Sequence, residues 1–264
     1  MITRVEGVHL ELFGGDIESV ARAKGELIES LPTDGIAVLN ADHRYVAAMA
    51  DRTSARVLRY GLSSDADVYA SAIVVDDELR ASFRLHTPVG GFHRRAPGGG
   101  AGEHQVPNAL AAAAAGGGLG VAIEDIANGM SAAELSGLRM ELAKARDGGA
   151  IVLNDAYNAN PTSMSAALKS LAALPVRRRV AVLGTMAELG SDSPAQHLAI
   201  ALEAHELGIE VIAVDEPNYG DTARHASGVD EAVAALGDLA DGDALLVKGS
   251  RVAALERVAQ ALLA

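Results

Sequence analysis

Short unbroken runs of hydrophobic residues alternate with longer amphipathic stretches throughout the second half of the chain. The runs AIVLND, RVAVLG, EVIAVD and ALLVKG begin at Ala150, Arg179, Glu210 and Ala244. Unbroken apolar runs of this length are typical of parallel strands that are buried on both faces of a sheet. The amphipathic stretches predict helices at residues 161–174, 193–208, 229–240 and 250–263. This half of the chain is therefore predicted to form a doubly wound α/β domain.

The first half of the chain has a less regular pattern. Residues 19–31 suit an amphipathic helix that ends before Pro32, and two apolar runs predict strands at residues 36–39 and 56–60. Residues 67–95 contain short, partly alternating segments that predict a β-meander. A mixture of helices and strands is therefore expected here as well.

A glycine-rich loop is predicted at residues 96–102, followed by a helix with an alanine-rich body that begins near Gln105. The run Gly116–Gly117–Gly118 is expected to interrupt this helix, because each glycine costs about 1 kcal/mol relative to alanine inside a helix. A second, short helix is predicted at residues 123–130.

The periodicity fades at residues 131–139, which predicts a linker between two domains, residues 1–130 and 131–264. The chain has a formal net charge of −13, and such a surface repels the phosphates of nucleic acids. It contains no cysteine, which excludes disulfides, thiolate catalysis and cysteine-ligated zinc. No secretory signal or stretch of about 20 apolar residues is present. We therefore expect a soluble, cytoplasmic protein that does not bind nucleic acid or insert into a membrane.

Polar side chains gather where two of the predicted parallel strands end, and ligands of such sheets bind at the carboxyl ends of the strands. Asp155, Tyr157, Asn158 and Asn160 follow the first strand, and this many polar groups are costly there unless they hydrogen-bond something. Lys248, Ser250 and Arg251 follow the last strand, where they either recognise a phosphate or carboxylate or simply begin a helix.

Three further groups of residues have a chemical and a plain structural interpretation. His104 and Asn108 lie at a predicted helix start, where they either face a cleft together or only cap the helix. His9 and Glu11 offer an imidazole and a carboxylate to a divalent cation, although a single histidine is more often an ordinary surface or core residue. Lys24 is by itself a solvated charge on the first helix.

Taken together, seven segments in one order resemble the Mur ligase family over nearly the whole chain. They are HLELFG, ARAKGELI, VLNAD, GEHQVPNALAAAA, LNDAYNANPTSM, VLGTMAELG and LVKGSR. The DAYNANP and MAELG segments are similar to those of the members that add D-alanyl-D-alanine to UDP-N-acetylmuramoyl-tripeptide. The resemblance implies part of a P-loop-type α/β central domain followed by a Rossmann-like C-terminal domain. It also implies peptidoglycan precursor synthesis, in which ATP converts the substrate carboxylate to an acyl phosphate that an amine attacks.

The resemblance further implies roles for individual residues. A catalytic set would consist of Lys24, His9, Asp155 and Arg139. His9 and Lys24 would serve magnesium, Lys24 after carbamylation, which requires a neutral amine. The residues implied around the nucleotide and the incoming amino acid are Asn108, His104, Arg139, Asp155, Tyr157, Asn158 and Asn160. Those implied to bind the substrate are Lys248, Ser250 and Arg251.

The sequence departs from the family pattern in two ways. No Gly-x-x-x-x-Gly-Lys-Ser/Thr segment, which would cradle phosphates, occurs in the chain, and the family carries this loop upstream of the matched region. Within the shared motifs, Arg4, Glu6, Gln105 and Thr185 replace more usual residues. The chain is therefore expected to be part of a ligase that is inactive without an N-terminal half. The alternative is a non-catalytic interaction module that keeps the C-terminal fold.

Overall fold

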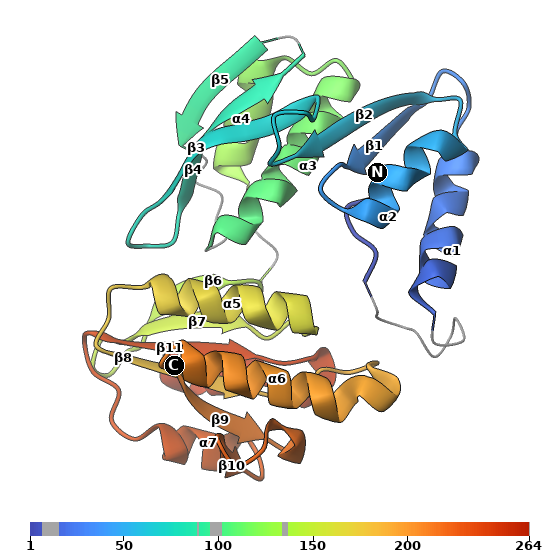
Figure 1. The fold of residues 1–264 in the computed structure, drawn as a ribbon. Coiled ribbons are helices and arrows are strands. Elements are labelled where there is room, and N and C mark those ends of the chain that lie inside the picture. Colours follow the sequence, from blue (N-terminus) through green and yellow to red (C-terminus); the bar gives the residue numbers. More distant parts are fainter. Residues whose placement is uncertain (7–15, 89, 96–101, 134–136, 264) are drawn as a thin grey trace. The chain divides into compact units, whose positions relative to one another are not determined.

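The computed structural model describes residues 1–6, 16–88, 90–95, 102–133 and 137–263. The chain divides into two compact units, which are coloured blue to green and yellow to red in Figure 1. Unit 1 contains residues 1–76, 80–98 and 103–134, and unit 2 contains residues 77–79, 99–102 and 135–264. No helix in the described part of the chain is long and apolar enough to cross a membrane.

Unit 1 contains a five-stranded sheet in the order β1-β2-β3-β4-β5. The first three strands are parallel, and β4 and β5 complete an antiparallel meander. The strands are β1 (Ile36–Asn40), β2 (Arg56–Gly61), β3 (Val68–Val75), β4 (Ala81–Thr87) and β5 (Gly90–Arg95). The helices are α1 (Ile17–Glu29), α2 (Arg44–Ala47), α3 (Val106–Gly118) and α4 (Ile123–Ala132), with short 3-10 helices at Ala48–Arg52 and Glu103–Gln105.

Alternate side chains of β1 enter two different cores. Val38 packs in a cluster with Leu110 of α3, whereas Leu39 packs in a cluster with Ile28 of α1. The two-residue period of a strand produces this division, because successive side chains point to opposite faces. The helix α1 begins where the carboxylate of Asp16 accepts two backbone N–H groups, and this cap fixes the start of the segment that carries Lys24.

Unit 2 contains a six-stranded sheet in the order β10-β9-β8-β11-β7-β6, in which only β6 is antiparallel to its neighbour. The strands are β6 (Glu141–Lys144), β7 (Ile151–Asp155), β8 (Arg178–Leu183), β9 (Glu210–Val214), β10 (Arg224–Ala226) and β11 (Asp243–Lys248). The helices are α5 (Pro161–Ala173), α6 (Ser193–Glu206), α7 (Val229–Leu236) and α8 (Glu256–Leu263), with 3-10 helices at Gly190–Asp192, Pro217–Tyr219 and Arg251–Ala253.

Helices cover both faces of this sheet, as Figure 1 shows for α5 and α6 in front. One core joins residues such as Val152, Val182 and Leu245 of the strands to α7 and α8. The helices α5 and α6 contact β8, β9 and β11. The predicted doubly wound α/β fold is therefore confirmed, and so are the four parallel strands that the apolar runs predicted.

Three details of the sequence prediction were wrong. Strands β6 and β10 were not expected, because four- and three-residue strands at a sheet edge carry no clear apolar run. Gly116–Gly118 does not interrupt α3, which includes all three glycines. The last predicted helix is divided at Ala254, which has a φ of 48° and separates the short helix after Ser250 from α8.

Candidate functional site

The carboxyl ends of β7 and β11 lie side by side and bring two oppositely charged side chains together. The two strands are parallel neighbours, and Asp155 is paired in register with Lys248. Each residue is the last of its strand, so the side chains lie where the loops of a parallel sheet begin. The sequence placed both residues at strand ends, but the register that makes them neighbours follows only from the fold.

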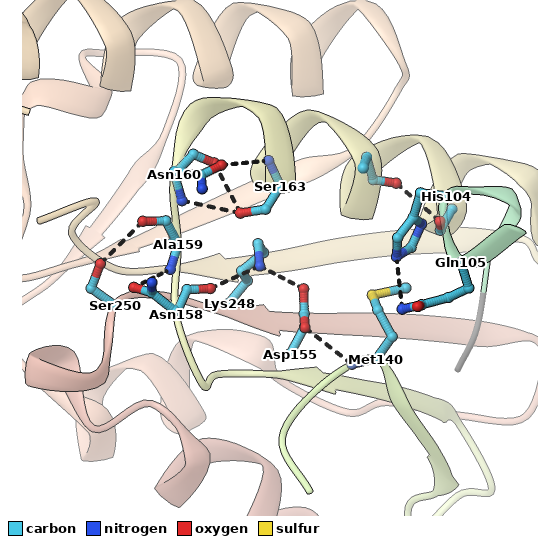
Figure 2. A network of polar contacts seen from close by, with 12 residues as sticks. His104, Gln105, Met140, Asp155, Asn158, Ala159, Asn160, Ser163, Lys248 and Ser250 are labelled. Carbon is cyan, nitrogen blue, oxygen red and sulfur yellow. Dashed lines mark hydrogen bonds and ion pairs between the residues drawn. The ribbon is translucent and has the colours of Figure 1, made fainter. Parts of the chain in front are cut away.

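Lys248 is almost completely buried, with 2% of the residue exposed. Its Nζ lies 2.5 Å from Oδ2 of Asp155 and donates to the backbone oxygen of Asn158 at 3.0 Å (Figure 2). Burial lowers the pKa of Lys248, while the Asp155 carboxylate acts in the opposite direction. A buried ammonium is tolerated in a protein when such partners satisfy its N–H groups.

Both oxygens of the Asp155 carboxylate are engaged. Oδ1 accepts the backbone N–H of Met140 at 3.0 Å, and Oδ2 accepts Lys248. Asp155 therefore joins the segment before β6 to the ends of β7 and β11. Because each carboxylate oxygen has two lone pairs, the group retains the capacity to accept a further hydrogen bond.

Ser250 connects the same edge to the loop after β8. Its hydroxyl donates to the backbone oxygen of Ala159 at 3.3 Å and accepts the N–H of Ala187 at 2.9 Å. The backbone N–H of Ser250 also donates to the oxygen of Thr185 at 2.9 Å. We refer to Met140, Asp155, Asn158, Lys248 and Ser250 as the strand-end network.

Two exposed arginines of unit 2, Arg139 and Arg251, lie next in the chain to members of this network, Met140 and Ser250. The guanidinium of Arg139 lies 4.0 Å from the centre of the Tyr157 ring, in a cation–π contact. Tyr157 is 45% exposed and Arg139 is exposed as well, so the ring supports the cation while the guanidinium stays accessible to solvent. Arg251 has a side chain that is 61% exposed and lies 3.5 Å from Glu256.

Asn160, which the resemblance placed near the nucleotide, has a structural role at the start of α5. Its side-chain oxygen accepts the N–H of Ser163 at 2.8 Å, and the Ser163 hydroxyl accepts the N–H of Asn160 at 3.0 Å. This reciprocal pair is a capping box, and Pro161 occupies the first helical position. Asn160 therefore caps the start of α5, whatever else its side chain contacts.

The predicted residues of unit 1 lie in two separate places. Lys24 is exposed on α1 and donates to the backbone oxygen of Arg4 at 3.1 Å. Arg4 forms an exposed ion pair with Glu6 at 3.1 Å, so these two departures from the family pattern are partners. His9 lies outside the described residues.

At the start of α3, Gln105 connects the two other predicted residues of unit 1. Its Nε2 lies 3.3 Å from Nε2 of His104, and its Oε1 accepts from Nδ2 of Asn108 at 2.8 Å. The longer Gln105 side chain in place of the usual asparagine thus fixes the neighbouring polar groups. Asn108 is exposed and His104 is half-buried.

His197 on α6 is an important residue that the sequence did not indicate. It is fully buried, its Nε2 accepts the N–H of Met186 at 2.8 Å, and its Nδ1 lies 2.7 Å from the Ser193 oxygen. The nearby Tyr219 hydroxyl donates to the oxygen of Gly184 at 2.8 Å. Together they hold the loop of the MAELG segment. A histidine four residues after a serine in a helix gives no sequence signal of this contact.

The chain matches two models of Mur ligase domains. The Mur ligase middle domain matches residues 1–116, and the Mur ligase glutamate ligase domain matches residues 138–251. The chain is also similar to UDP-N-acetylmuramoyl-tripeptide–D-alanyl-D-alanine ligases. It is 38% identical to that of Mycobacterium tuberculosis (strain CDC 1551 / Oshkosh), with 100% of this chain and 58% of the relative covered. It is 35% identical to that of Escherichia coli (strain K12), with 99% and 59% covered.

A crystal structure of MurF from Acinetobacter baumannii superposes with a TM-score of 0.87 at 29% identity, covering 99% of this chain and 58% of the other. The chain thus spans somewhat more than half of the length of the relatives that it matches. The two domain models follow one another along the chain and together match most of it. The chain belongs to the Mur ligase family.

Proposed function

We propose that this chain provides the C-terminal part of an ATP-dependent ligase that adds D-alanyl-D-alanine to UDP-N-acetylmuramoyl-tripeptide. The relatives from Mycobacterium tuberculosis and Escherichia coli are named for this reaction and match essentially the whole chain. The DAYNANP, MAELG and LVKGSR segments, which the family resemblance rests on, all lie at the carboxyl edge of one sheet. We assign residues 1–130 to a partial central domain and residues 131–264 to the C-terminal domain.

The arrangement of Arg139 and Asp155 is the observation that best supports this proposal. Bound ATP supplies the phosphoryl group that activates the substrate carboxylate. Arg139 presents accessible guanidinium N–H groups, which suit phosphate oxygens. Asp155 is held from both sides and can accept from a hydroxyl group of the nucleotide or substrate. Unit 2 thus carries both a guanidinium that can donate hydrogen bonds to phosphate oxygens and a carboxylate, held in one position, that can accept a hydrogen bond from a hydroxyl group.

Magnesium is implied by the family resemblance, with His9 and Lys24 as the residues that would serve it. Lys24 in its ordinary ammonium form donates to the Arg4 oxygen and is not a metal ligand. Among the residues that the structure describes, no three histidine, aspartate or glutamate side chains gather as a metal site.

ATP binding by the 264-residue chain alone is expected to be weak. The sequence lacks a Gly-x-x-x-x-Gly-Lys-Ser/Thr loop, whose amides and lysine would hold the phosphates. Its net charge of −13 gives no general attraction for a polyanion. Contacts from Arg139 and Asp155 alone are expected to give a Kd no better than about 1 mM, or about −4 kcal/mol. Calorimetry with ATP and magnesium measures this value, and micromolar binding would contradict it.

A complementation assay tests the ligase proposal. The purified chain is mixed with the portion of the Mycobacterium tuberculosis relative that precedes the matched region. ATP and magnesium are added, and the release of phosphate from ATP is followed in the presence of UDP-N-acetylmuramoyl-tripeptide and D-alanyl-D-alanine. We expect turnover only when both proteins and both substrates are present, and loss of turnover with Asp155→Asn. Binding of the two proteins without any turnover would instead favour the non-catalytic interaction module.

A further inference from the structure

The segment 248–251 begins with the last residue of β11 and contains two cations, of which one is buried and one is exposed. Lys248 is 2% exposed, whereas the side chain of Arg251 is 61% exposed. The sequence alone places both cations at a position suited to an anionic ligand. Only one of them has an ammonium or guanidinium group that solvent can reach.

The contacts of Lys248 account for its burial. Its ammonium has three N–H donors, of which one is directed to Asp155 and one to the backbone oxygen of Asn158. Both partners belong to the DAYNANP segment, which runs from the last residue of β7 to the first residue of α5. The ion pair neutralises the charge of Lys248 inside the protein, so little of this charge is offered to a bound anion.

We propose that Lys248 is a positioning residue that fixes Asp155 and the loop of residues 155–160, and that it does not bind substrate or nucleotide itself. The expected effect of Lys248 on turnover rests on the proposed ligase function. Its role in fixing Asp155 does not. Ser250 supports the same arrangement, because its hydroxyl joins Ala159 to Ala187 across β11. Of the cations of unit 2 that the family resemblance implies, Arg139 and Arg251 are then the two with exposed side chains.

Lysine modification tests the structural part directly, because the chain contains only four lysines. Three of them, Lys24, Lys144 and Lys169, are exposed. Reductive methylation with ¹³C-formaldehyde of the folded chain is expected to label these three rapidly and Lys248 only after unfolding in urea. Labelling of Lys248 at the rate of Lys169 in a chain that remains folded would overturn the proposal.

A double-mutant cycle tests whether Lys248 acts through Asp155. Lys248→Met leaves a buried carboxylate without its cation, and Asp155→Leu leaves a buried cation without its carboxylate. Each single variant is expected to lower Tm by about 10 °C. The double variant is expected to recover part of this loss, because it leaves no unpaired charge, although the Met140 N–H and the Asn158 oxygen lose their partners. Additive losses would show that the two side chains act independently and would contradict the proposal.

The ligase assay described above distinguishes positioning from ligand binding. If Lys248 acts only through Asp155, then Asp155→Asn should reduce turnover by about 100-fold, and adding Lys248→Met to that variant should reduce it no further. A combined variant that is much worse than either single variant would show a separate contact of Lys248 with a ligand, and would overturn the assignment. If the unmodified chain gives no turnover, the ligase proposal fails, while the labelling and stability experiments still decide whether Lys248 holds Asp155.

Discussion

Two glycines inside helices of unit 1 have very different surroundings, and the same substitution should affect them in opposite directions. Gly25 is a buried residue in the middle of α1, and Gly117 is an exposed residue in the last turn of α3. Neither has a positive φ, so alanine is compatible with the backbone at both sites. A β-carbon at Gly117 would lie 3.9 Å from Ile126, whereas one at Gly25 would lie 1.8 Å from the guanidinium of Arg52.

The expected magnitudes follow from these contacts. Gly117→Ala should stabilise the chain by about 0.5–1 kcal/mol, since alanine gains helix propensity and meets only an ordinary van der Waals contact. At Gly25 the same gain of about 1 kcal/mol is opposed by displacement of Arg52. That guanidinium donates to the backbone oxygens of Ala21 and Arg22 and to Glu29. Loss of these bonds costs about 2–3 kcal/mol, so Gly25→Ala should destabilise by about 1–2 kcal/mol.

Urea denaturation followed by circular dichroism measures both changes, with the m value as a check that the unfolding transition is the same. The variant Arg52→Met provides the control. In that background the guanidinium is absent, and Gly25→Ala should become neutral or stabilising. The opposite result would be that Gly25→Ala stabilises the chain while Arg52 is still present. That result would show that the Arg52 guanidinium does not prevent a β-carbon at residue 25, and it would refute this explanation.

Three further predictions concern unit 2. Burial alone would raise the pKa of Asp243, but hydrogen bonds from the Ala240 N–H and from Arg177 outweigh burial and lower this pKa. The Asp243 carboxylate therefore stabilises the folded chain above about pH 4, and this stabilisation is lost as the pH falls through the folded pKa. Asp243→Asn should therefore cost about 1–3 kcal/mol in urea denaturation at pH 7, and this cost should shrink as the pH falls through the folded pKa of Asp243. Asn160→Ala should lower stability by about 1 kcal/mol through loss of the cap, while Asn160→Ser should retain most of it in the same assay. Residues 137–264 should melt cooperatively by themselves, and residues 149–264 should melt at a lower temperature because β6 and its pairing with β7 are removed.

The apolar pattern of the sequence was sufficient to predict four of the five parallel strands and most helices of unit 2. Strand–helix alternation is a local signal, and a strand buried on both faces must be apolar throughout. The same pattern correctly placed Asp155 and Lys248 at strand ends. It could not show that these strands are neighbours, because β7 and β11 are separated by three strands and three α-helices along the chain.

The missed features depend on contacts between distant segments. β6 is recognised as a strand only through its pairing with β7, and His197 is important only because its ring reaches the Met186 N–H. The Gly116–Gly118 run was judged by propensity alone. In the structure Gly118 faces Ile36 and Leu58 of the sheet, so the close packing of α3 on β1 and β2 maintains the helix despite its glycines.

The strand-end network shows why a sequence motif should not be equated with a set of ligand contacts. In LVKGSR, the lysine and the serine bond to neighbouring loops of the same unit, and only the arginine has a largely exposed side chain. In DAYNANP, the aspartate and the last asparagine bond to the protein itself, while the tyrosine supports the exposed Arg139. A binding site at this edge of the sheet needs both the residues that bond within the protein and those with exposed side chains. An exposed donor binds a ligand effectively only when the loop that carries it is held in one conformation. Substitution of an internal member should therefore change stability and binding together, whereas substitution of Arg139 or Arg251 should change binding and leave Tm nearly unaltered.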